Sequence, residues 1–219
     1  MKTRRPTRRN GKKPEMLTAY DDDMNVIGDF PRPVVHYNAM WHRVAQCWVI
    51  GSSEKGLRVY LQRRSFEKKS HPGRYDITAG GHVSAGESAV TGMIREMKEE
   101  TGLILKPGHM IHVGDYREVS GNDHEIASIF IHFENDPPFH PGPEVIYMVS
   151  ANLEEFRALS QGDVDEIMVV PAIRTGPMKD EAFKVGPQNF CNHRSFIELV
   201  YPYIKKHETE IKKKLYPGV

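Results

Sequence analysis

The sequence has few cysteines and lacks a long apolar run. Its two cysteines, Cys47 and Cys191, do not have the spacing of metal ligands. Two reduced thiols are typical of a cytosolic protein, so we expect a cytoplasmic location. No apolar stretch approaches the ~18–20 residues that a transmembrane helix needs, and the N-terminus lacks the apolar core of a secretory signal. The sequence therefore predicts no association with a membrane.

The sequence also lacks an excess of positive or negative charge. Lys and Arg number 30 and Asp and Glu number 29, for a formal net charge of +1 in 219 residues. The chain as a whole is therefore not attracted to nucleic acid, which is not a favoured partner. The exception is the segment 1–14, where seven residues are basic and none is acidic. We interpret it as a disordered, solvated tail, although a nucleic-acid-binding or targeting segment would have a similar composition.

The most informative stretch is 81–103, in which a glycine loop precedes an acid-rich segment. The apolar residues of that segment recur at i, i+3, i+4 and i+7, which predicts a helix with one buried face. They are Val90, Met93, Ile94 and Met97. Glu96, Glu99 and Glu100 recur at i, i+3 and i+4 and so share a second face. Gly102 suits the left-handed position just after a helix end.

This acid face is destabilising by itself. Like charges at i, i+4 repel one another, and acids near a helix C-terminus oppose the macrodipole. A bound cation would relieve both effects, and carboxylates are the ligands that suit Mg²⁺ or Mn²⁺. A solvated charged face is the alternative. The glycine loop, the neighbouring Arg95, and Gly92, which leaves room one turn before Glu96, favour the cation site.

Nine positions in this stretch match a known motif in type and spacing. They are Gly81, Glu87, Arg95, Glu96, Met97, Glu99, Glu100, Gly102 and Leu103. The stretch resembles the Nudix box in full. The resemblance implies an α/β fold, the Nudix α/β/α sandwich with a mixed β-sheet. It also implies a hydrolase that uses Mg²⁺ or Mn²⁺ to cleave a diphosphate linkage in a small molecule, either a nucleoside diphosphate derivative or a related organic diphosphate.

The resemblance also implies roles for particular residues. The metal ligands would be the carbonyl of Gly81 and the carboxylates of Glu96, Glu99 and Glu100. Glu87 and Arg95 would pair as a brace between the loop and the helix. The group that accepts the proton from the attacking water varies within the family. Our candidates are Glu99 inside the box and Glu125 or Glu166 outside it, with Glu96 counted among the catalytic acids.

Substrate contacts are expected from segments outside the box. A cluster of basic residues precedes the glycine loop, and a guanidinium suits phosphate oxygens. The candidates are Arg63, Arg64 and Arg74, for which a solvated basic loop is the alternative. We expect the loops 118–125 and 136–143 to line the pocket. Tyr75, Tyr116 or Phe139 could stack on a base there, although a core or rim position is equally consistent. Nucleotides, nucleotide sugars and thiamine diphosphate all remain open as substrates.

A weaker resemblance extends from about 18 to about 172. It is to the Nudix branch related to isopentenyl diphosphate isomerase. It is carried by Trp41-His42-Arg43, Gln62-Arg63-Arg64-Ser65, His71-Pro72-Gly73-Arg74-Tyr75-Asp76 and Ala79-Gly80-Gly81-His82. That isomerase has a cysteine just before the Gly-His pair, which takes part in proton transfer at carbon. This chain has Thr78-Ala79-Gly80 there, and Cys47 lies well upstream in an expected strand.

The isomerase also has a histidine-rich metal site with two acids. His42 and His82 match two of its histidines, and His36 matches a third one residue out of register. Asp123 and Glu125 match the acid pair, with Asp123 in place of a glutamate. A histidine beside a buried strand is also consistent with a plain hydrogen-bonded core residue. Because the cysteine is missing and the box is complete, we favour hydrolysis. Isomerase-like chemistry and an RNA-directed Nudix hydrolase that uses the basic tail are the alternatives.

The remaining pattern predicts the elements and the domain organisation. Alternating apolar runs predict a hairpin from 44–50 and 57–62, and a short strand at 75–79. Further strands are expected at 109–116, 126–133, 145–150 and 166–170, with helices at 153–159 and at 196–215, the latter kinked near Pro202. We predict a tail at 1–14, a Nudix domain at 15–175, and a linker with a C-terminal helical extension at 176–219. A homodimer is left open.

Overall fold

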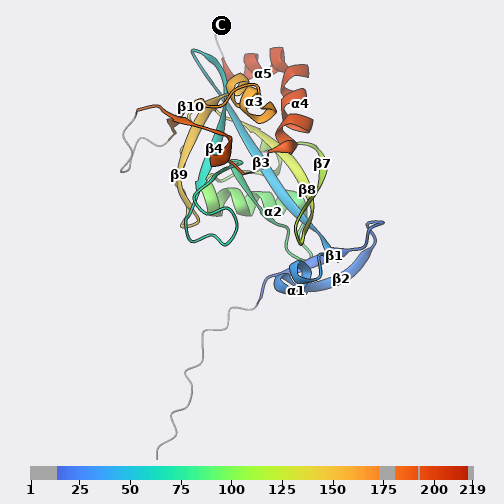
Figure 1. Cartoon of the computed structure of the whole chain (residues 1–219). Coiled ribbons are helices and arrows are strands. Elements are labelled where there is room, and N and C mark those ends of the chain that lie inside the picture. The colour runs from blue at the N-terminus through green and yellow to red at the C-terminus, as the bar shows by residue number, and fades with distance from the viewer. Residues whose placement is uncertain (1–13, 173–180, 192, 217–219) are drawn as a thin grey trace, which may run out of the picture.

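The computed structural model describes residues 14–172, 181–191 and 193–216 (Figure 1). The predicted disorder of the basic tail concerns residues that lie, apart from Pro14, outside this description. Within the described residues, no helix combines the length and the apolar character required to cross a bilayer.

One mixed sheet organises the described part of the chain. Its main strand order is β11-β10-β9-β4-β3-β1-β2, while β8 joins β3 in parallel and carries β7, and the short β5 and β6 pair with β4 and β3. The strands are β1 (Met16–Tyr20), β2 (Val26–Pro31), β3 (Trp41–Ser53), β4 (Gly56–Arg64), β5 (Tyr75–Asp76), β6 (Ala79–His82), β7 (Met110–Ser120), β8 (Asp123–Phe133), β9 (Val145–Asn152), β10 (Ile167–Pro171) and β11 (Phe183–Val185).

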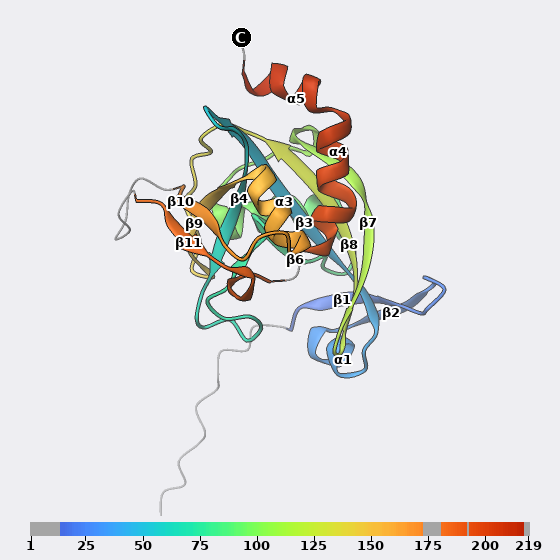
Figure 2. The same ribbon diagram turned by 45° about the horizontal axis from the view of Figure 1, so that its top comes forward.

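Helices cover both faces of this sheet (Figures 1 and 2). They are α1 (Arg32–Tyr37), α2 (Ala89–Glu96), which continues into a π turn (Met97–Thr101), α3 (Leu153–Gln161), a second π turn (Phe196–Val200), α4 (Tyr201–Lys206) and α5 (Glu208–Leu215). Short 3₁₀ turns occur at Pro107–His109 and Pro187–Asn189. The predicted α/β architecture with a mixed sheet is confirmed.

The central strand β3 is buried on both faces. Trp48 and Ile50 contribute to a first core that lies between the sheet and α3, α4 and α5. Cys47 and Val49 point the other way, into a second core under α2. A strand that is covered on both sides reads as a nearly continuous apolar run, which is why 44–50 was recognisable in the sequence. The predicted hairpin 44–50/57–62 is confirmed as β3 and β4.

The box helix begins and ends where its sequence predicts. The Ser88 hydroxyl caps its start by accepting a hydrogen bond from the Thr91 amide at 3.1 Å. Met93 and Met97 are fully buried in the second core. Gly102 follows with a φ of 77°, the left-handed conformation that favours glycine. The last turn is a π turn, a local irregularity that often occurs at functional sites.

The C-terminal helix differs from its prediction. We expected one helix over 196–215 with a kink near Pro202, but the chain bends at His207, which separates α4 from α5 (Figure 2). Pro202 follows directly after the π turn Phe196–Val200, and the helical backbone continues through both as far as Lys206. The local irregularity next to the proline is therefore this π turn. The bend brings Ile211 and Leu215 of α5 into the first core.

The segment between the expected domain and this helix is also structured. Its strand β11 pairs antiparallel with β10 and extends the sheet. Phe190 is buried in the first core beside Phe156, with ring centroids 5.7 Å apart. The described part of the predicted linker therefore belongs to the same packed body as the sheet.

Candidate active site

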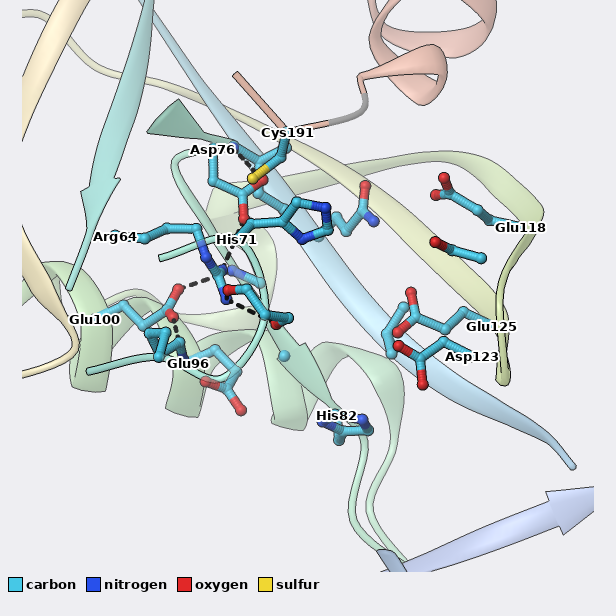
Figure 3. A pocket seen from close by; sticks show the side chains of 18 of the residues that line it. Arg64, His71, Asp76, His82, Glu96, Glu100, Glu118, Asp123, Glu125 and Cys191 are labelled. Carbon is cyan, nitrogen blue, oxygen red and sulfur yellow. Dashed lines mark hydrogen bonds and ion pairs between the residues drawn. The ribbon is translucent and has the colours of Figure 1, made fainter. Parts of the chain in front are cut away.

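A cavity of about 880 Å³ lies where β3, β6, the box helix and the β7–β8 hairpin meet. Glu96 and Glu100 lie on one side of it, and Glu118, Asp123 and Glu125 lie on the other (Figure 3). The described part of the C-terminal segment contributes a further wall. Both predicted loops, 118–125 and 136–143, contribute residues to the lining.

Glu96 is held against the glycine loop. Its side chain is only 13% exposed, and it accepts a hydrogen bond from Arg95 Nη1 at 2.5 Å. A Cβ at Gly81 would overlap the Glu96 carboxylate, so the close approach of the loop to this acid requires glycine there. Burial raises the pKa of Glu96, and the Arg95 guanidinium opposes that rise.

Glu100 is the most buried acid of the box. Its side chain is 4% exposed, and its Oε2 accepts hydrogen bonds from Gln62 Nε2 at 2.8 Å and from the Gly80 amide at 3.0 Å. The ammonium of Lys68 lies 3.9 Å from Oε1. Burial raises the pKa of Glu100 to about 7, against the effect of these donors.

Arg95 joins the loop to the helix. Its guanidinium donates to both carboxylate oxygens of Glu87, at 3.2 and 3.0 Å, and to the carbonyl of His82 at 2.8 Å. Glu87 in turn accepts from the Ser84 amide at 3.1 Å. Burial alone would raise the pKa of Glu87, but its hydrogen bonds with Arg95 and Ser84 outweigh burial and lower it. These contacts place Glu87 and Arg95 where a brace between loop and helix requires them.

Glu99 lies at the rim of the cavity rather than on its floor. Its side chain is 60% exposed and lies 3.4 Å from Arg95 Nη1. The prediction that the three acids share one face assumed α-helical phase, whereas the chain is a π turn from Met97 to Thr101. All three glutamates still line the cavity.

The structure places the three candidate arginines differently. Arg64 lines the cavity and donates to Asp76 at 2.8 Å and to the Ser70 carbonyl at 3.2 Å. Arg63 points to the opposite face of β4, with its Cζ 4.7 Å from the centre of the Tyr75 ring. Arg74 is not among the lining residues and donates to the Phe190 carbonyl at 3.4 Å. Only Arg64 of the three is brought to the cavity.

The two outer candidates for proton acceptor are placed differently as well. Glu125 lines the cavity from β8, and burial together with the nearby Asp123 and Glu118 raises its pKa to about 7. Glu166 lies just before β10, is not among the lining residues, and forms an ion pair with Lys184. The structure therefore brings Glu125 to the cavity and leaves Glu166 away from it.

Among the three aromatic candidates for base stacking, only Tyr116 lines the cavity. Tyr75 is fully buried, and its hydroxyl lies 2.9 Å from that of Tyr147. Phe139 is 5% exposed and packs edge-on against Tyr60 at 5.4 Å. For Tyr75 and Phe139, the alternative of a core position is therefore the one that the structure shows.

Three histidines meet beside the cavity. Ligand nitrogens of His36, His42 and His82 lie within 4.8 Å of one another. His36 Nδ1 contacts Asp123 Oδ1 at 2.6 Å, and its Nε2 lies 3.0 Å from His82 Nε2. His42 Nδ1 contacts the Met40 carbonyl at 3.0 Å, which can only accept, so Nδ1 carries the proton and Nε2 the lone pair.

This arrangement fits a divalent transition metal. His42 is fully buried, and its Nε2 has no hydrogen-bond partner among the described residues. Burial lowers the pKa of His42 and lowers that of His82 to about 2, so both rings are neutral, as a metal ligand must be. Imidazole nitrogens are suitable ligands for such metals. A carboxylate commonly fixes the orientation of a ligating histidine through its other ring nitrogen, and Asp123 contacts His36 in this way. The out-of-register His36 thus joins the cluster.

Sequence reasoning missed several residues of the cavity. Lys68, which belongs to the basic cluster recognised in the sequence, lines the cavity as well, but His71 of the same loop was not expected there. Cys191 and Arg194 come from the segment that was expected to be a linker. Cys191 lies beside Asp76 (Figure 3). No local pattern could have indicated these two, because their position depends on β11 returning the chain to the sheet. Gln62, which contacts Glu100, could have been found from the alternation of β4, since it shares a face with Arg64.

Comparisons with known proteins show to which family the chain is similar. The family model of the NUDIX domain matches residues 40–171. A Nudix hydrolase of Clostridium acetobutylicum, described as uncharacterised, is 27% identical over 198 residues, covering 87% of this chain and 94% of that protein. An isopentenyl-diphosphate Delta-isomerase of Cutibacterium acnes is 36% identical over 97 residues, 44% of this chain and 47% of that protein.

The fold is found among solved structures as well. A protein of Deinococcus radiodurans superposes with a TM-score of 0.53 at 19% identity, covering 66% of this chain and 87% of that one. This likeness supports the fold alone. The family model covers more than half of the chain, and the resemblance of 81–103 to the Nudix box is thereby confirmed: the protein belongs to the Nudix hydrolase family.

Proposed function

We propose that this protein is a divalent-cation-dependent hydrolase that cleaves a diphosphate linkage in a small organic diphosphate, with the cavity beside Glu96 and Glu100 as its active site. The observation that carries the proposal is the low exposure of these two carboxylates, 13% for Glu96 and 4% for Glu100, beside Gly81 in a cavity of about 880 Å³. Buried acids without a cation are destabilising, and Mg²⁺ or Mn²⁺ prefers carboxylate and carbonyl oxygens.

The chain supplies the ligands and their support. Glu96, Glu100 and the Gly81 carbonyl would hold the cation, and Glu99 would approach it from the rim. When bound, the cation neutralises phosphate oxygens and lowers the pKa of a water molecule. Arg95 holds Glu96 in place through its 2.5 Å contact and ties it to Glu87.

Other lining residues would bind the substrate and take up the proton. Arg64 is fixed by Asp76, so its guanidinium is oriented before the substrate arrives, and it would donate to a diphosphate oxygen. Lys68 lies close enough to Glu100 to contact the same phosphate. Glu99 and Glu125 both line the cavity and are the two remaining candidates for accepting the proton from water.

The first test is hydrolysis of a panel of diphosphates with Mg²⁺ or Mn²⁺. The panel contains nucleoside di- and triphosphates, nucleotide sugars, dinucleoside polyphosphates, thiamine diphosphate and isopentenyl diphosphate. We expect metal-dependent release of phosphate or nucleotide from at least one compound. Glu96→Gln should lower kcat by about 100-fold or more, because one anionic ligand is lost while the side-chain volume is kept.

The matched control is Glu54→Gln, which changes an exposed glutamate in the β3–β4 turn. It should hydrolyse the same compound at the wild-type rate. A Glu96→Gln protein as active as wild type would remove the metal assignment. Thermal unfolding of each variant shows whether a loss of activity is a loss of fold.

Isomerase-like chemistry is a second candidate, favoured by the histidine cluster alone. A histidine-rich second metal site would need a free ring nitrogen and a histidine held in place by an acid. The unpaired Nε2 of His42 and the contact of His36 with Asp123 provide these. The isomerase cysteine is missing, however, since Thr78-Ala79-Gly80 stands directly before the Gly81-His82 pair. The same panel separates the two candidates, because isopentenyl diphosphate would be rearranged without release of phosphate. Such a result, with no hydrolysis of any compound, would replace the hydrolase proposal.

A further inference from the structure

Gln62 lies on β4, beneath the box helix, on the face of the strand that points toward Glu100. It is 1% exposed, so water does not solvate its amide. Alternation along the strand places it on the same face as Tyr60 and Arg64, and opposite Leu61 and Arg63. Its Nε2 donates to Glu100 Oε2 at 2.8 Å and lies 3.5 Å from the Thr78 carbonyl.

The other end of this amide is left without a partner. Gln62 Oε1 is buried and accepts no hydrogen bond from the described residues. An unpaired buried carbonyl is destabilising, and native proteins contain few of them. Turning the amide over would not help, because Oε1 would then face the Glu100 carboxylate, and two acceptors repel. The orientation of Gln62 is therefore set by Glu100 Oε2, which also accepts the Gly80 amide hydrogen.

Glu100 in turn has both of its close donors on one oxygen. The Gly80 amide reaches Oε2 at 3.0 Å, and Gln62 Nε2 reaches the same atom at 2.8 Å. The two donors come from different strands, β6 and β4, and together they fix the rotation of the carboxylate. Its Oε1 takes neither of these hydrogen bonds and lies 3.9 Å from the ammonium of Lys68, which also lines the cavity.

We propose that Gln62 is a positioning residue for cation binding: its amide locks Glu100 Oε2, so that Oε1 is presented to the metal at a fixed angle. The inference rests on the proposed function, since it assumes that Glu100 is a ligand. It explains why a fully buried glutamine with an unpaired carbonyl is found where an apolar residue of the same size would pack. A residue kept for stability alone would not have that defect.

The test is Gln62→Met, which keeps the volume of the side chain and removes both polar atoms. Two quantities are measured on the full chain: Mn²⁺ affinity, from the free Mn²⁺ signal in electron paramagnetic resonance, and the melting temperature in EDTA. We expect the Mn²⁺ dissociation constant to rise about 10-fold or more, as for other groups that orient a metal ligand. The melting temperature without metal should stay within about 3 °C of wild type, because the lost hydrogen bond is offset by removal of the unpaired carbonyl.

Gln161→Met is the matched control. Gln161 ends α3 and is not among the cavity-lining residues, so this variant should bind Mn²⁺ as wild type does. Gln62→Asn guards against a folding failure of the Met variant. It keeps an amide but shortens the side chain by one carbon, so the donor cannot reach Glu100 and Mn²⁺ affinity should fall as in Gln62→Met.

The outcomes separate this inference from the function on which it rests. Wild-type Mn²⁺ affinity in both Gln62 variants would overturn the positioning role while leaving the hydrolase proposal intact. A fall in melting temperature with unchanged Mn²⁺ affinity would assign Gln62 a structural role and would overturn the positioning role as well. If wild-type protein itself binds no Mn²⁺, the metal-dependent function fails, and the inference fails with it.

Discussion

The carboxyl group of Glu125 shows how strongly one residue of the cavity depends on its neighbours. Burial is the main cause that raises its pKa to about 7, and the nearby Asp123, Glu118 and Asp76 add to it. Near neutral pH this group is therefore divided between its protonated and ionised forms. Its ionised form is destabilising unless a cation or a cationic substrate group is present.

Glu125→Gln should stabilise the metal-free protein at alkaline pH. The folded pKa of about 7 lies above the model value of 4.5, so the folded state holds a proton that the unfolded chain has lost between these values. Wild-type stability thus falls as pH rises from about 4.5 to about 7 and then levels off, by about 3 kcal/mol from this group. Replacing the acid by an amide removes that fall. The gain should be present at pH 8 and absent at pH 4.

Urea unfolding in EDTA at the two pH values measures this effect. Glu67→Gln changes an exposed glutamate and serves as the control, for which no pH-dependent gain is expected. If Glu125→Gln changed the free energy of unfolding equally at pH 4 and pH 8, the surroundings of Glu125 would not disfavour its ionised form.

At this scale, sequence reasoning can assign a side chain to one face of a strand, but it cannot tell how far that side chain lies from the cavity. Arg63 and Arg64 are neighbours of identical type, and only the strand assignment of 56–64 puts them on opposite faces. Because Leu57, Val59 and Leu61 were recognised as one face, alternation would have assigned Arg63 to that face and Arg64 to the other. Glu166 could not have been excluded in this way, since its distance from the cavity depends on the whole sheet order.

At the scale of elements, the end of the box helix is stabilised by the loop 136–143. The His140 amide donates to the Thr101 carbonyl at 2.8 Å, and the Gly142 amide donates to the Glu100 carbonyl at 3.1 Å. These carbonyls have no partner within their own helix, so the loop satisfies them. The loop can approach only because Gly102 and Gly142 lack side chains.

Gly102→Ala should therefore destabilise the protein. The residue has a φ of 77°, and an added Cβ would lie 2.6 Å from the His140 carbonyl oxygen. The backbone conformation alone costs about 1–2 kcal/mol for alanine, and the displaced loop adds to this, so we expect a loss of about 2 kcal/mol or more. The measurement is chemical unfolding of the metal-free protein.

Gly108→Ala is the control for this change. Gly108 lies in the 3₁₀ turn Pro107–His109, and a Cβ there would meet no atom within 4 Å. The alanine should leave stability within about 0.5 kcal/mol of wild type. Equal stability of the two variants would mean that the loop does not depend on the close approach at Gly102.

The elements themselves were well predicted where periodicity is strong. The strands expected at 109–116, 126–133, 145–150 and 166–170 correspond to β7, β8, β9 and β10. The last helix has a π turn just before Pro202, where we expected an irregularity, but the break at His207, which brings Ile211 and Leu215 into the first core, was not expected. The π turn of the box helix has no sequence signature that distinguishes it from an α turn.

On the scale of the whole molecule, the C-terminal segment is packed into the body that the family match defines. The NUDIX match ends at residue 171, yet side chains beyond it fill the first core. Phe196 is fully buried, with its ring 5.0 Å from that of Trp48 on β3 and 4.8 Å from that of Phe156 on α3. Cys191 and Arg194 of the same segment line the cavity. We therefore expect residues 181–216 to fold together with the sheet.

Phe196→Ala should destabilise the whole molecule in one step. Truncation of a buried aromatic side chain costs about 3–5 kcal/mol, because the cavity that it leaves collapses only in part. Since Phe196 bridges Trp48 and α3, the loss should lower a single transition that tryptophan fluorescence and far-ultraviolet circular dichroism report at the same denaturant concentration. Phe66→Ala removes a phenyl ring that is 71% exposed and should cost less than about 1 kcal/mol. Two separate transitions, with only the weaker one shifted by Phe196→Ala, would instead show that the C-terminal helices form an independent extension. The walls that Cys191 and Arg194 contribute to the cavity would then not depend on the stability of the sheet.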